Sequence, residues 1–125
     1  MKCLAVLLLL STIMVRAEAA DLSQQIAKYN LSLDKQTVQV VSRELKHYPP
    51  VMIYIARRES SFNPKAHSRG CIGLTGVNSK VWSKTLIEKG IIRSSHDLWT
   101  VKYNLKAGWY IFKYYNKSYR RYRGL

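Results

Sequence analysis

The 125-residue sequence is short of acidic residues, of cysteine and of flexible low-complexity stretches. It holds 7 aspartates and glutamates against 21 lysines and arginines, and only two cysteines. It contains no internal repeat and no Gly/Ser-rich linker, so a repeat protein or a chain of tethered domains is excluded. Two cysteines are too few for a small disulfide-rich scaffold. We therefore expect one small domain with a single hydrophobic core.

The longest apolar run is also too short to span a membrane. It covers residues 3–15, well below the roughly 20 residues that a transmembrane helix needs. Small residues at Ala17 and Ala19 follow it, in the pattern of a signal-peptide cleavage site. We predict a secretory signal peptide over residues 1–19 and a mature domain over residues 20–125, exported to the periplasm or cell envelope without stable membrane insertion. An uncleaved membrane anchor is the weaker alternative.

Removal of this leader changes both the cysteine count and the charge. Cys3 would leave with it, so we expect Cys71 to be a small buried residue with no internal disulfide. The leader carries two of the 21 basic and one of the 7 acidic residues, which leaves 19 against 6 and a formal charge of +13. Such a surface favours polyanions, which outside the cytoplasm are wall carboxylates, lipid headgroups and polymer phosphates. We expect no nucleic-acid partner, although the terminal "NKSYRRYRGL" interleaves tyrosine with arginine as nucleic-acid binders do.

Capping residues and helical spacing predict a mainly α domain. The expected helices follow Asp21 through Tyr29, follow Asp34 as far as "HYPP", run from Pro50 through "VMIYIARRES", follow Asn78 through Lys89, and begin at Asp97 or Thr100. Gly90 is expected to end the fourth helix, which would bury Val81, Trp82 and Leu86. Gly108 would allow close approach of another helix. The polar segment from Ser60 to Gly76 is expected to form an irregular loop that carries the site.

The remaining conspicuous residues indicate no metal or cofactor. Three tryptophans at helical spacing are expected in the core, and three histidines without metal-ligand spacing are expected at the surface. These are Trp82, Trp99 and Trp109, and His47, His67 and His96. Of the six carboxylates in the mature chain, three are expected to cap helices and two to be solvated; these are Asp21, Asp34 and Asp97, and Glu44 and Glu88.

Glu59 is the sixth carboxylate and the candidate catalytic residue. Met52, Ile55 and Glu59 fall at helical positions i, i+3 and i+7, so the carboxylate shares an apolar face while Arg57 and Arg58 point elsewhere. Burial would raise its pKa, and nearby arginine charge would lower it. We expect burial to dominate, so that Glu59 can serve as a general acid. From composition alone, an ion pair with one of the arginines is an equally open alternative.

The segment "ARRESSFNPKAHSRGCIGLTGVN" resembles the catalytic segment of the lytic transglycosylases with the goose-type lysozyme-like fold. That family has the pattern E-S-x-F-N-P-x-A, a short loop, and then G-x-x-G-L-x-Q-[IV]. Downstream, "DLWTVKYNLKAGWYIF" is similar to the family's D-P-x-x-N-I-x-A-G-x-x-Y-L, so the likeness runs from Pro50 to about Tyr115. The resemblance implies a lysozyme-like helical domain with Glu59 as its catalytic glutamate. It implies substrate contacts from Ser60, Ser61, Asn63, Thr75, Gly76, Val77 and Asn78.

The sequence departs from the family pattern at two places. Gly76 stands where the family usually has a glutamine that helps to hold the sugar, so this contact is missing or is supplied by Thr75 or Asn78. The family also continues into an A-x-x-x-Y-N-x-G block whose tyrosine lies against the catalytic glutamate. The sequence ends at Leu125 before any such block, so we expect a domain that lacks it at the C-terminus.

The resemblance implies an exported, monomeric peptidoglycan lytic transglycosylase that needs no cofactor. It would cleave the β-1,4 bond between N-acetylmuramic acid and N-acetylglucosamine in glycan strands and leave a 1,6-anhydro product. Enzymes of this size are linked by resemblance to local wall opening by secretion, conjugation, pilus or phage machines. The alternatives are a truncated, non-catalytic wall-binding remnant and a muramidase that hydrolyses the bond with water.

Overall fold

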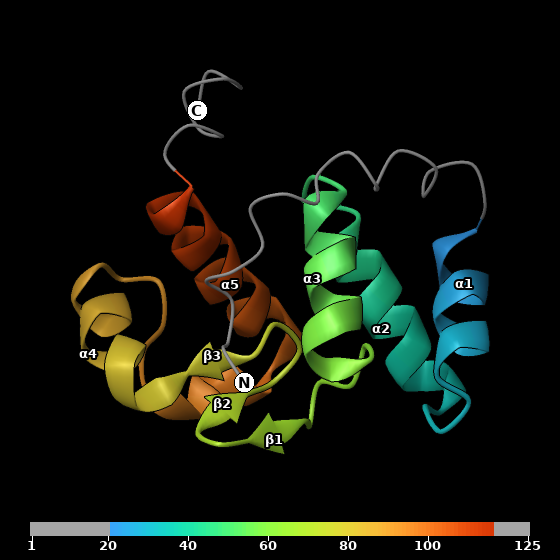
Figure 1. The fold of residues 1–125 in the computed structure, drawn as a ribbon, viewed down its shortest axis with the longest axis horizontal. Helices are drawn as coiled ribbons and strands as arrows, with labels where there is room; N and C mark the ends of the chain where they lie inside the picture. Colours follow the sequence, from blue (N-terminus) through green and yellow to red (C-terminus); the bar gives the residue numbers. More distant parts are fainter. Residues whose placement is uncertain (1–20, 117–125) are drawn as a thin grey trace.

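A computed structural model describes residues 21–116, which form five α-helices, one 3₁₀ helix and a small sheet (Figure 1). In chain order the elements are α1 (Leu22–Tyr29), α2 (Lys35–Leu45), α3 (Val51–Ser60), β1 (His67–Ser68), β2 (Cys71–Ile72), β3 (Val77–Asn78), α4 (Ser79–Glu88), η3 (Ser95–Trp99) and α5 (Val101–Tyr115). The predicted leader and most of the terminal tyrosine-arginine stretch lie outside the described residues. No helix within residues 21–116 has the length and apolar character to cross a membrane.

Four of the predicted helix starts are confirmed by side-chain caps. Asp21, Asp34, Asn78 and Thr100 each accept a hydrogen bond from a backbone N–H in the first turn that follows, which satisfies a donor that the helix itself leaves unpaired. Gly90 has φ +73°, as a left-handed stop requires. The alternative start at Asp97 is wrong, because this residue lies within η3 and its carboxylate binds Arg93.

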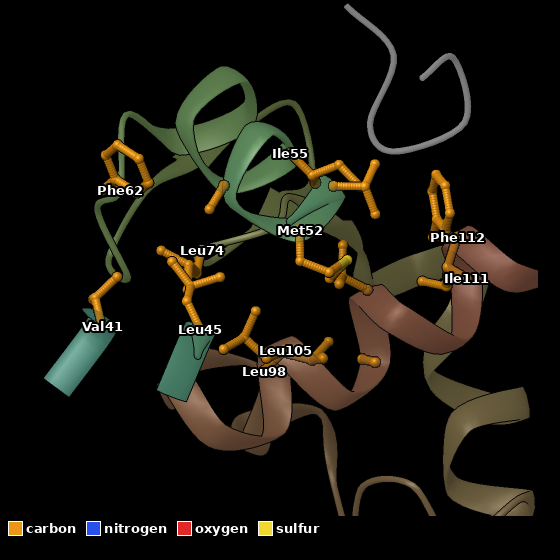
Figure 2. Packing of buried hydrophobic residues seen from close by; sticks show 14 of the residues in the cluster. Val41, Leu45, Met52, Ile55, Phe62, Leu74, Leu98, Leu105, Ile111 and Phe112 are labelled. Carbon is orange, nitrogen blue, oxygen red and sulfur yellow. The ribbon is translucent and has the colours of Figure 1, made fainter. Parts of the chain in front are cut away.

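The core lies between α3 and α5 and is closed by residues from the other elements (Figure 2). Met52 and Ile55 of α3 are completely buried, and each such side chain contributes about 1.5–3 kcal/mol to folding. Residues from α2, the loop after α3, η3 and α5 surround them: Leu45, Leu74, Leu98, Leu105 and Phe112. Helix α3 is therefore anchored along one side, and that side carries Glu59 near its C-terminal end.

The segment after α3 is more ordered than the predicted irregular loop. Strands β1, β2 and β3 form an antiparallel sheet in that order, with Ile72 paired to His67 on one side and to Val77 on the other. The sheet lies at the C-terminal end of α3 (Figure 1). Strands of two residues are too short to show an alternating pattern in the sequence, so they could not be predicted.

Three expectations about packing are wrong. Val81 is 62% exposed, because β3, η3 and the α5 tyrosines that contact Trp82 leave its side of α4 uncovered. Trp99 is 39% exposed at the end of η3, with its ring beside His67, whereas Trp82 and Trp109 do pack against the core. At Gly108 the closest approach is by Thr75 of the loop, where another helix was expected. The three histidines follow the expectation: His47, His67 and His96 are exposed.

Cys71 is buried, as expected, with 6% of its surface exposed. It is disulfide-bonded in the complete chain, whereas the expectation of no bridge concerned the mature chain of residues 20–125. That expectation assumed cleavage of the leader. The other half of the bond lies outside the described residues.

Candidate active site

Glu59 lies in the last turn of α3 and is half-buried. Burial raises the pKa of its carboxyl from the ordinary 4.5 to about 7, and the charge of Arg58 opposes this shift with a smaller effect. Among residues 21–116, no other carboxylate contributes to the shift. Near neutral pH the carboxyl is therefore present in both protonated and ionised forms. A residue in this state can donate a proton in one step and accept one in another.

The two arginines beside Glu59 both have tyrosine partners. The guanidinium of Arg57 lies 5.5 Å from the ring centre of Tyr29 and 5.6 Å from that of Tyr54. Nη1 of Arg58 donates to the hydroxyl of Tyr54 at 3.3 Å. In the described part of the chain, no hydrogen bond or ion pair reaches the Glu59 carboxyl, so the ion-pair alternative is wrong. These tyrosine contacts were not predicted, although Tyr54 precedes the arginines by three and four residues, a spacing that places helical side chains together.

The backbone at Gly76 lies directly against the Glu59 carboxyl. A Cβ atom at position 76 would be 3.2 Å from both Cβ and Oε1 of Glu59. Gly76 also has φ +67°, a backbone conformation that is unfavourable for residues other than glycine. The position where the resembled family has glutamine is therefore next to the candidate acid, and here it presents only backbone.

The turn after Glu59 is fixed by hydrogen bonds and left-handed backbone. The hydroxyl of Ser60 is 2.9 Å from the carbonyl of Ala56 and 2.7 Å from that of Leu74, and it joins α3 to the loop. Ser61 and Phe62 both have positive φ. The carbonyl of Ser61 accepts a hydrogen bond from the side chain of Asn30, and Phe62 is buried. These contacts set the direction in which the chain leaves α3.

The other predicted substrate-binding residues are mostly engaged within the protein. The side chain of Asn63 accepts the N–H of Lys65 and shapes the loop, and that of Asn78 caps α4. Thr75 and Val77 have no exposed surface. The structure thus brings Glu59, Ser60 and Gly76 together, with Ser61 exposed on the turn. It gives Thr75 and Asn78 internal partners, so neither side chain is free to replace the missing glutamine.

Asn104 organises the loop from within the protein, and it lies in the downstream segment that is similar to the family pattern. It is 1% exposed. Its Oδ1 accepts the N–H of Thr75 at 2.8 Å and the hydroxyl of Thr75 at 2.6 Å. Its Nδ2 donates to the carbonyls of Ile72 at 2.9 Å and Leu98 at 2.8 Å. An asparagine four residues before Gly108 on an otherwise apolar helix face was the available signal.

A comparison with family models agrees with this arrangement. The model described as the transglycosylase SLT domain matches residues 36–125, which is 90 of the 125 residues and includes α3, the sheet and α5. No curated protein and no solved structure matches the chain. The mainly helical architecture is that of a lysozyme-like domain, as the sequence predicted. The chain belongs to the transglycosylase SLT domain family.

Proposed function

We propose that the protein is a peptidoglycan lytic transglycosylase in which Glu59 is the general acid and the general base. The family suggests lytic transglycosylase activity on peptidoglycan. The observation that carries the assignment to Glu59 is its state: a half-buried carboxyl with a pKa of about 7 and no counter-ion among residues 21–116. A solvated or ion-paired glutamate would be ionised at neutral pH and would be a poor proton donor.

The proposed reaction needs a single carboxyl group. Protonated Glu59 gives its proton to the glycosidic oxygen between N-acetylmuramic acid and N-acetylglucosamine, and the bond to the muramoyl anomeric carbon breaks. The muramoyl acetamido group supports the developing cation. Ionised Glu59 then takes the proton of the muramoyl 6-hydroxyl, whose oxygen closes the 1,6-anhydro ring and restores the acid. A glycosidase of the common type would need a second carboxylate, and none within residues 21–116 influences the pKa of Glu59.

Export and a role in local wall opening are further parts of the proposal. They are supported by the leader-like sequence of residues 1–19 and by the basic surface expected of the mature chain. Glycan strands of peptidoglycan are the proposed substrate, and the enzyme would act as a monomer. A secretion, conjugation, pilus or phage machine is the proposed setting.

The test is digestion of purified sacculi, with mass spectrometry of the released fragments. We expect anhydromuropeptides from the wild type and a loss of release of about 100-fold or more from Glu59→Gln, because an amide cannot deliver the proton. Glu59→Gln should still sediment with sacculi, and Glu88→Gln, at an exposed position on α4, should release fragments at the wild-type rate. Fragments with a reducing muramic acid end would show a muramidase, and sedimentation without release by the wild type would show a binding module. Either result would overturn the proposal.

A further inference from the structure

The loop that faces Glu59 is held from behind by three residues, which we call the clasp: Asn104 and Gly108 on α5, and Thr75 on the loop. We infer that Asn104 is a positioning residue, which through the clasp holds residues 72–76 against Glu59 and keeps water from its carboxyl group. The inference rests on the proposed function of Glu59, and it assigns to Asn104 no contact with substrate.

The amide group of Asn104 is fully used within the protein. Its oxygen accepts two hydrogen bonds, both from Thr75, and its nitrogen donates two, to Ile72 and Leu98. Each bond lies between 2.6 and 2.9 Å, and the residue is 1% exposed. A buried amide with four satisfied bonds is costly to disturb, because loss of a partner leaves a desolvated polar group. The clasp is therefore a stiff connection between the loop and α5.

The segment from Leu74 to Gly76 transmits this connection to α3. Thr75 is its middle residue and is held by Asn104. On one side of Thr75, the carbonyl of Leu74 accepts the hydroxyl of Ser60, the residue that directly follows Glu59. On the other side, Gly76 lies against the Glu59 carboxyl. A shift of Thr75 toward or away from α5 would therefore move the backbone that covers Glu59.

Gly108 allows the loop to lie as close to α5 as it does. A Cβ atom at position 108 would be 2.8 Å from Cβ of Thr75 and closer still to its hydroxyl oxygen. Replacing a glycine inside a helix with alanine normally stabilises the helix by about 1 kcal/mol. Here the added methyl group would push Thr75 away from Asn104, so we expect Gly108→Ala to be harmful to the clasp.

The consequence for Glu59 is a change in hydration. Arg58 is the charged group among residues 21–116 that acts on the pKa of Glu59. Residues 72–76 contain no titratable side chain, and the neighbouring Cys71 is disulfide-bonded. Withdrawal of the loop would thus act by hydrating the carboxyl, not by moving a charge. Hydration lowers a carboxyl pKa that burial has raised.

The test is a titration of Glu59 followed by ¹³C NMR of its side-chain carboxyl in the complete protein, together with the pH profile of fragment release. We expect the pKa of Glu59 to fall by about one unit or more in Asn104→Ala and in Gly108→Ala, and by less in Thr75→Val, which loses only the hydroxyl. Thr75→Ser keeps the hydroxyl and should titrate as the wild type does. The alkaline limb of the pH profile of fragment release should move to lower pH together with the pKa of Glu59 measured by NMR.

A control separates positioning from general loss of stability. Val41→Ala removes buried volume in α2, far along the chain from the clasp, and should destabilise the protein without moving the pKa of Glu59. If Asn104→Ala does not fold, Thr75→Val and Gly108→Ala carry the same test. A Glu59 pKa that stays near 7 in the clasp variants, or that falls equally in Val41→Ala, overturns the inference. Wild-type cleavage by Glu59→Gln would instead overturn the proposed function, and the NMR result would stand by itself.

Discussion

Gly76 lies beside Glu59, since a Cβ atom at residue 76 would be 3.2 Å from Oε1 of the carboxyl. The contact partly shields the acid with backbone, which carries no charge and no titratable group. The positive φ of Gly76 and the small space beside Glu59 both favour glycine at this place. Gly76 is therefore explained by the local structure, without reference to a sugar contact.

Gly76→Ala should lower both stability and activity. Left-handed backbone costs a non-glycine residue about 1–2 kcal/mol, and the new methyl group would also press on Glu59. Gly90→Ala is the matched control, since Gly90 has φ +73° but no atom within 4 Å of its Cβ position. We expect both variants to lose stability in urea unfolding, Gly76→Ala more than Gly90→Ala, and only Gly76→Ala to lose fragment release. Equal losses in the two variants would show that the contact with Glu59 has no effect.

The raised pKa of Glu59 should make the protein less stable as pH rises. The folded state holds the proton up to a pKa of about 7, whereas the unfolded chain releases it near 4.5. Between these values the native state binds more protons, so the free energy of unfolding falls as pH increases from 4.5 to 7 and is level above that range. Glu59→Gln lacks this titration. The free energy of unfolding of Glu59→Gln minus that of the wild type should therefore be larger at pH 8 than at pH 5.

Urea unfolding of both proteins at pH 5 and pH 8 measures this difference. Glu88→Gln makes the same chemical change at an exposed site and serves as the reference. If the stability difference between Glu59→Gln and the wild type is the same at both pH values, Glu59 is not held in its protonated form by the fold.

Arg58 and Arg57 should differ in their effect on Glu59 although they are neighbours. Arg58 lowers the pKa of Glu59, so Arg58→Gln should raise that pKa above the wild-type value of about 7. Arg57 is engaged with the rings of Tyr29 and Tyr54, and Arg57→Gln should leave the pKa unchanged while it costs about 0.5–1 kcal/mol of stability. Titration of the Glu59 carboxyl by NMR distinguishes the two. A drop in its pKa in Arg58→Gln would contradict this assignment of charges.

The features that could be predicted from the sequence are those that short segments determine. Asp34 caps α2 by accepting an N–H from Thr37, three residues away, and such a bond needs only local sequence. The partial burial of Glu59 follows from its place on one helix face with Met52 and Ile55. In each case the responsible groups lie within about two helical turns, so the pattern is visible in the sequence.

The features that could not be predicted depend on residues far apart in the chain. Asn104 and Thr75 are separated by 29 positions, and nothing near either residue indicates the other. The same is true of Asn30, whose side chain binds the carbonyl of Ser61 across 31 positions. Packing of the whole domain decides these contacts, and they hold the loop and the turn on either side of Glu59.

Asp97 and Arg93 form a strong polar contact whose loss should lower stability in acid. The carboxylate accepts the backbone N–H of Arg93 at 2.8 Å and two guanidinium bonds at 3.1 and 3.0 Å. These bonds lower the pKa of Asp97 from 3.8 to about 2. The stabilisation is therefore complete above pH 3.8 and is lost as pH falls toward 2.

Asp97→Asn should lower Tm by several degrees at pH 7, measured by circular dichroism, and the difference from the wild type should shrink near pH 2. Asp21→Asn keeps a capping oxygen and should change Tm little. A deficit in Asp97→Asn that is as large near pH 2 as at pH 7 would show that the ion pair is not its cause.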